Sequence, residues 1–239
     1  MNFTQVAKML KHSLGLATPP IGLAFLEEPP AGVPRYAQAV PTACTFWKAA
    51  QTSLFYATAE DHYNCPIGAI TQGFKPPAEV MEQAMQLIGQ MGKIQYFDAA
   101  EVGNIPSVEK PHSVVVYGPL EAFSEVAPDL AMIICKPFQA MLISEATGAS
   151  AWQGAGKESH IFGRPACAVI PSALKESATA ASLGCMGART FAGIEDGEMI
   201  VAIPLDGITA LSEESLKILN ANAEMQNFYK DRKAQFAAV

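Results

Sequence analysis

Hydrophobic residues recur at helical spacing in the first segment of the chain. Phe3, Val6 and Leu10 fall three or four positions apart, which predicts a helix over 3–14 with one buried face. The apolar stretch 21–26 that follows has prolines on both sides. Because proline has no N–H to donate to a sheet, this pattern predicts a short strand that ends before the prolines.

Continuous apolar runs mark the middle of the chain and its last third. They read "HSVVVYGPL" at 112–120, "LAMIIC" at 130–135 and "EMIVAIPL" at 198–205. Strands that are covered on both faces carry such runs instead of an alternating pattern. We therefore expect three central strands here, and a fourth strand in "RPACAVIP" at 164–171.

Amphipathic or capped segments lie between these runs and predict helices. The expected helices cover residues 45–58, 76–92 and 136–148, a segment capped by Ser172, and closing helices of which Ser212 caps the first. Residues 149–164 are rich in glycine and polar side chains, so we interpret them as a mobile or ligand-facing loop.

The alternation of strands and helices determines the expected fold class. It favours an α/β or α+β fold with a mixed central sheet flanked by helices. We expect a single compact domain over 1–239. The likeness of "CAVIP" to "VAIPL" leaves open a division into two related halves with a break near 105–112.

Composition and charge exclude several classes of partner. Half of the 239 residues are apolar, 16% are charged and the formal net charge is −7. The lysines and arginines are scattered, and a nucleic-acid backbone needs clustered positive charge, so we exclude nucleic acid. No secretory signal or membrane span is recognisable, which predicts a soluble cytoplasmic protein. Exposed apolar residues such as Phe228 and Phe236 leave homo-oligomers open.

The cysteines are the main candidates for chemistry. A reducing compartment disfavours disulfides, and no CxxC pair occurs. Cys44 lies at a predicted helix entrance, Cys65 precedes a proline, and Cys185 lies between Gly184 and Gly187, all settings that packing alone does not require.

Other candidate residues are fewer. Cys135 and Cys167 lie in apolar runs and, taken singly, are interpreted as core residues. His62 lies three positions before Cys65, and Arg189 four positions after Cys185, where a guanidinium suits an anion. The sequence contains no HExxH, Walker or EF-hand pattern and no GxSxG elbow. The motifs therefore leave open whether the protein is an enzyme.

Five phrases together resemble one family. They are "CPIGA" at 65–69, "KPFQAML" at 136–142, "ACAVIP" at 166–171, "SLGCMGAR" at 182–189 and "EMIVAIPL" at 198–205. In this order they resemble the uncharacterised prokaryotic family called domain of unknown function 169. The resemblance implies family cysteines at Cys44, Cys65, Cys167 and Cys185, with asparagine more usual at the position of Cys135. It thus separates four candidate metal ligands from one structural cysteine.

Four cysteines in one set suit a cofactor-binding redox protein. Our leading hypothesis is a [4Fe-4S] cluster or metal held by the four cysteines, with Gly68, Gly184 and Gly187 allowing close wrapping and Arg189 offsetting negative charge. One alternative is a haem, other tetrapyrrole or small-molecule binding protein. Another is a thiol-dependent enzyme that uses Cys185 as nucleophile, and a further one is that the cysteines only pack. The expected partner is a redox protein or a small-molecule ligand.

Overall fold

The structure is a computed structural model that describes residues 2–96, 99–148 and 161–237. A mixed sheet of seven strands, in the order β2-β3-β1-β4-β7-β6-β5, runs through these residues. All neighbouring strands are antiparallel except the parallel pair β5 and β6. The strands are β1 Ile21–Leu26, β2 Phe55–Thr58, β3 Val114–Pro119, β4 Leu130–Cys135, β5 Ile161–Phe162, β6 Ala180–Ser182 and β7 Met199–Pro204.

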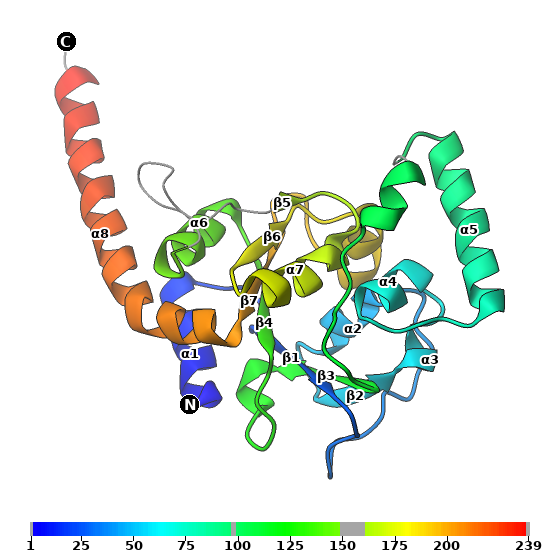
Figure 1. Ribbon diagram of the computed structural model, residues 1–239. Coiled ribbons are helices and arrows are strands. Elements are labelled where there is room, and N and C mark those ends of the chain that lie inside the picture. The colour runs from blue at the N-terminus through cyan, green and yellow to red at the C-terminus, as the bar shows by residue number, and fades with distance from the viewer. Residues whose placement is uncertain (1, 97–98, 149–160, 238–239) are drawn as a thin grey trace.

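Helices cover both faces of the sheet (Figure 1). Successive side chains of a strand point to opposite faces, and each face accordingly has its own buried cluster. One face packs against α2, α4 and α7, and the other against α1, α6 and α8. The helices are α1 Phe3–Leu14, α2 Cys44–Ala49, α3 Ala59–His62, α4 Pro66–Thr71, α5 Ala78–Lys93, α6 Pro137–Ala146, α7 Val169–Glu176 and α8 Leu205–Ala237. This is the single α/β fold with a mixed sheet that the sequence predicts.

Several predicted elements have the observed bounds. The helix over 3–14 and the strand over 21–26 coincide with α1 and β1. The continuous apolar runs form β3, β4 and β7, in which every residue but Met199 is buried. Strands buried on both faces explain why these runs do not alternate.

Three predicted elements near cysteines are wrong. Ser172, which was expected to cap a helix, lies inside α7. The helix expected over 45–58 ends at Ala49, and residues 55–58 form β2, whose Phe55 and Ala57 are buried against the sheet. The strand expected over 164–171 is instead a 3₁₀ turn, Ala166–Ala168, followed by α7. An apolar run of this length fits a buried helix as well as a strand, and tertiary packing decided between them.

The C-terminal segment forms one long helix instead of several. It begins at Leu205, so Ser212 lies inside α8 and does not cap a helix. Most of the loop expected over 149–164 lies outside the described residues. No helix among those described is both long and apolar enough to cross a membrane.

Candidate cysteine site

The four candidate cysteines lie on one face of the sheet, each where a helical segment begins. Cys44 is the first residue of α2, and Cys65 is the N-cap of α4. Cys167 lies in the 3₁₀ turn that leads into α7, and Cys185 immediately precedes helical residues 186–192. The first turn of a helix leaves backbone N–H groups without helical partners, and these groups favour negative charge.

The four thiols lie close enough to interact electrostatically. Burial, followed by the negative charges of Cys167, Cys185 and Cys65, raises the pKa of Cys44 well above its usual value. Burial and the charges of Cys65 and Cys185 raise the pKa of Cys167 to about 12. Burial and the charge of Cys185 also raise the pKa of Cys65. Each thiol therefore interacts with the other three, although they come from four separate segments.

Backbone and hydroxyl groups offset part of this effect. The backbone amides of Ala43 and Gly68 hydrogen-bond Cys65 and lower its pKa, although burial dominates. The Thr71 hydroxyl acts in the same direction on Cys167. The site thus offers hydrogen-bond donors to sulfur, which favour thiolates once a cation is present.

Gly68 allows α4 to approach Cys44's segment closely. A Cβ built at Gly68 would lie 2.7 Å from the Ala43 Cβ and 3.0 Å from the Cys65 Sγ. Both distances are shorter than ordinary contacts between such atoms. The close approach of Ala43 and Cys65 therefore requires glycine at this position.

The loop that carries Cys185 is held in shape by Arg189. Gly184 has a φ of +81°, a conformation that favours glycine. The Arg189 guanidinium donates to the Leu183 carbonyl at 2.6 Å through Nη2 and to the Glu195 carbonyl at 2.6 Å through Nη1. Arg189 thus fastens the two ends of the loop, while its predicted role beside an anion remains a prediction.

Of the other residues considered in the sequence analysis, Gly187 lies in the loop that carries Cys185, whereas Cys135 lies far from it. Gly187 has ordinary space, since a Cβ there would lie 3.8 Å from the Cys185 Sγ. The backbone N–H of Met186 donates to the Tyr96 hydroxyl at 3.1 Å, and the Arg164 guanidinium lies 4.0 Å from the centre of the Tyr96 ring. Cys135 is buried on the opposite face of the sheet, among the residues packed on α1 and α6.

A buried histidine and tyrosine next to the site were not identified as a pair from the sequence. His62 Nδ1 lies 2.6 Å from the Thr58 carbonyl oxygen, which can only accept, so Nδ1 carries the proton. Nε2 therefore accepts a hydrogen bond from the Tyr117 hydroxyl at 3.0 Å. Burial lowers the pKa of His62 to about 4, so the ring is neutral. Burial, followed by the charges of Cys167 and Cys44, raises the pKa of Tyr117, so this hydroxyl interacts electrostatically with two of the thiols.

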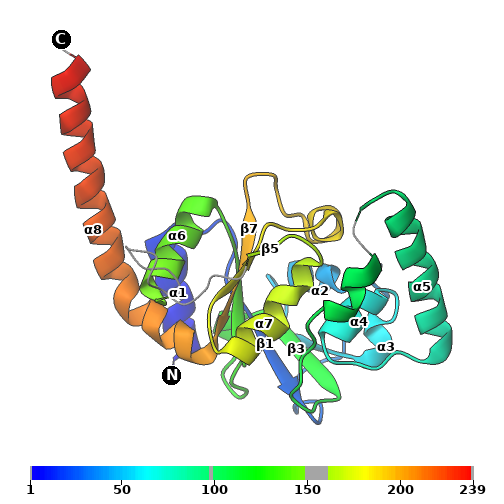
Figure 2. The same cartoon turned by 45° about the horizontal axis from the view of Figure 1, so that its top comes forward.

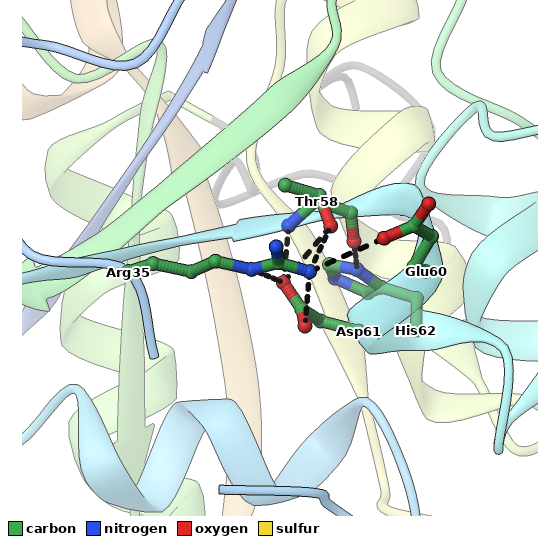
Figure 3. Close-up of polar contacts among 5 residues, drawn as sticks. All are labelled: Arg35, Thr58, Glu60, Asp61 and His62. Atoms are coloured by element: carbon green, nitrogen blue, oxygen red, sulfur yellow. Dashed lines mark hydrogen bonds and ion pairs between the residues drawn. The ribbon is translucent and has the colours of Figure 1, made fainter. Parts of the chain in front are cut away.

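This pair is connected to an ion-pair network nearer the surface. Figure 3 shows Arg35 and Thr58 directed toward Asp61, with His62 on the same short helix α3. The guanidinium of Arg35 contacts the Asp61 carboxylate through Nε at 3.0 Å and through Nη2 at 2.9 Å. Partial burial would raise the pKa of Asp61, but hydrogen bonds from Arg35 and Thr58 outweigh it and lower the pKa. The network holds the start of α3, and through it His62, in place.

Two further buried side chains have polar atoms without hydrogen-bond partners. Trp47 Nε1, one turn after Cys44, and both amide atoms of Gln72, at the end of α4, are enclosed and unpaired. Such atoms are rare in native interiors and call for an explanation.

In the described part of the chain, no three His, Cys, Asp or Glu side chains are grouped so that they could hold a metal ion.

Comparison with known proteins agrees with the phrases that contain the cysteines. The sequence profile of the domain of unknown function 169, described as uncharacterised ArCR, matches residues 9–214. The chain belongs to this family. The DUF169 match includes all four candidate cysteines and ends inside α8.

One curated relative of this DUF169 chain is an uncharacterised protein, MJ0308, from Methanocaldococcus jannaschii. The two are 29% identical over 164 residues, which cover 66% of this chain and 68% of the relative. No solved structure matches the chain significantly.

Proposed function

We propose that this chain is a redox protein that binds a [4Fe-4S] cluster through Cys44, Cys65, Cys167 and Cys185. The observation that carries the proposal is the mutual interaction of the four thiols, each at the start of a helical segment. The fifth cysteine, Cys135, interacts with Glu198 instead and lies across the sheet.

The electrostatics give a physical reason for a cationic group among the thiols. Without one, burial and the charges of neighbouring thiols raise the pKa values of Cys44, Cys65 and Cys167, which favours their protonated forms. Bound iron would favour the thiolates, and binding would release their protons. In a [4Fe-4S] cluster each cysteine binds a different iron, so the ligands need not crowd around a single ion.

Other residues of the site would support the bound group in specific ways. The backbone amides of Ala43 and Gly68 donate toward the Cys65 sulfur, and such hydrogen bonds tune the potential of iron–sulfur centres. Trp47 Nε1 is a buried N–H donor that lacks a partner, which fits a site whose acceptor is a bound group. The bound cluster would supply one-electron transfer.

The first experiment is anaerobic purification of the full chain, followed by iron and sulfide analysis and visible spectroscopy. We expect iron and acid-labile sulfide in near-equal amounts and a broad absorption that reduction bleaches. A protein that contains neither, including after anaerobic reconstitution with iron and sulfide, would contradict the proposal.

Cysteine variants distinguish the site from other cysteine chemistry. Replacing Cys44, Cys65, Cys167 or Cys185 singly by serine is expected to remove most of the iron, whereas Cys135→Ser is the matched control and retains it. A sharp Soret band on haem addition, with no iron–sulfur signal, would instead favour the tetrapyrrole alternative. Equal iron content in all five variants would mean that these cysteines are not ligands.

A further inference from the structure

The C-terminal part of α8 projects from the body of the protein, as Figures 1 and 2 show from two directions. The first part of this helix is anchored, because Ile208, Leu211 and Ser215 are buried and α8 packs on α1 and α6. Further along α8, Asn222 donates a hydrogen bond of 3.2 Å to Glu145 on α6. Every residue over 223–236 is exposed.

The projecting part continues the apolar stripe of the anchored part. Leu211, Ile218 and Met225 recur every seven residues, and the first of them is fully buried against the body. Residues seven apart share one helix face. From Met225 onward the same side of the helix carries large apolar residues that are exposed to solvent. Their relative exposures are 48% for Met225, 53% for Phe228, 61% for Tyr229 and 71% for Phe236.

A helix of this length gains little stability by itself. Helices shorter than about 12–15 residues are marginal in water, because most helical stability in proteins comes from packing of an apolar face. The exposed segment is of that size, and the family match ends at residue 214, before the segment begins. This segment is therefore an addition to the matched region, and it has no packing partner among the residues that the structure describes.

The charges of α8 indicate what kind of helix fits beside it. Residues 213–224 contain Glu213, Glu214 and Glu224 with one lysine, whereas residues 230–233 contain Lys230, Arg232 and Lys233 with one aspartate. A second copy in antiparallel orientation, centred near Phe228, brings Glu224 of each helix level with Arg232 of the other, whereas Glu213 and Glu214 lie in the anchored part. A parallel copy would place like charges side by side, which is unfavourable.

We propose that the projecting half of α8 pairs with the same segment of a second copy of this chain, in antiparallel orientation. In this arrangement the apolar stripes cover each other, with Phe228 near the centre of the contact and the aromatic residues on either side. Glu224 of one copy then lies level with Arg232 of the other. The pairing is independent of any cofactor at the cysteine site.

Sedimentation velocity of the full chain at micromolar concentration tests the pairing. We expect a dimer for the full chain and a monomer for a chain that ends at Ala221, which retains the anchored part of α8. Phe228→Asp should also give a monomer, whereas Asn227→Asp, which adds the same charge on the opposite helix face, should leave the dimer intact. A monomeric full chain, or a dimer that survives truncation, overturns the proposal.

Charge inversion tests the orientation. Arg232→Glu is expected to weaken dimerisation about tenfold, since both symmetric ion pairs with Glu224 become repulsive, and adding Glu224→Arg should restore it. Failure of the second substitution to restore the dimer overturns the antiparallel arrangement. A full chain that stays monomeric but co-sediments with phosphatidylserine vesicles would assign the stripe to a membrane surface and overturn the proposal.

Discussion

Gly68→Ala is the substitution whose outcome the structure determines most sharply. Helix propensity alone favours alanine, because alanine in a helix interior is more stable than glycine by about 0.5–1 kcal/mol. Gly68 lies within α4, Pro66–Thr71, so a sequence-based expectation is mild stabilisation. The surroundings of Gly68 predict the opposite.

The added methyl group meets atoms that cannot move freely. Its carbon would lie 2.7 Å from the Ala43 Cβ and 3.0 Å from the Cys65 Sγ, and Ala43 is fully enclosed directly before α2. Overpacking of this kind costs about 1–3 kcal/mol, which exceeds the gain from propensity. We expect net destabilisation of about 1–2 kcal/mol and separation of the segments that carry Cys44 and Cys65.

Urea unfolding measures the free energy, and iron content after anaerobic reconstitution measures the site. Gly89→Ala is the matched control, because Gly89 lies on exposed α5 with no atom within 4 Å of an added Cβ. That control should be stabilised by about 0.5–1 kcal/mol and keep its iron. The packing argument fails if Gly68→Ala is as stable as Gly89→Ala.

Three further predictions concern the buried pair of His62 and Tyr117 and the loop at Gly184. His62 remains neutral until its pKa of about 4, whereas the unfolded chain takes up a proton near pH 6.5. The stability of the wild type should therefore fall by up to about 3 kcal/mol as pH drops through this window; urea titrations of wild type and His62→Gln with identical pH profiles would refute this. Tyr117→Phe should cost about 1–2 kcal/mol in urea unfolding because it leaves His62 Nε2 without its donor, and an unchanged midpoint would argue against that bond. Gly184→Ala should lower the stability by about 1 kcal/mol because its φ is +81°, whereas thermal unfolding should show Gly187→Ala close to wild type.

Local patterns predicted many elements because they depend on neighbouring residues. The helical spacing of Phe3, Val6 and Leu10 and the prolines around the first strand determined α1 and β1 with their observed bounds. The pattern failed at Phe55 and at Cys167, where burial against distant strands selects the structure. An apolar stretch buried on all sides has no period from which helix and strand can be distinguished.

At the candidate site, even more depends on tertiary packing and less on local sequence pattern. His62 was visible as a neighbour of Cys65, but nothing local relates it to Tyr117, which lies on β3 and is brought to it by the pairing of β2 with β3. The close approach at Gly68 likewise depends on where α2 lies relative to α4.

The sequence by itself determined the fold class and most of the secondary structure, and through the family resemblance it predicted a set of four cysteines. Only the tertiary structure decided that Cys44, Cys65, Cys167 and Cys185 lie on the same face of the sheet and interact, with Cys135 on the other face. The physical reason is the distance along the chain over which each kind of interaction acts. Helix and strand preferences act over a few residues, whereas the distance between thiols far apart in the chain depends on the order and packing of every element between them.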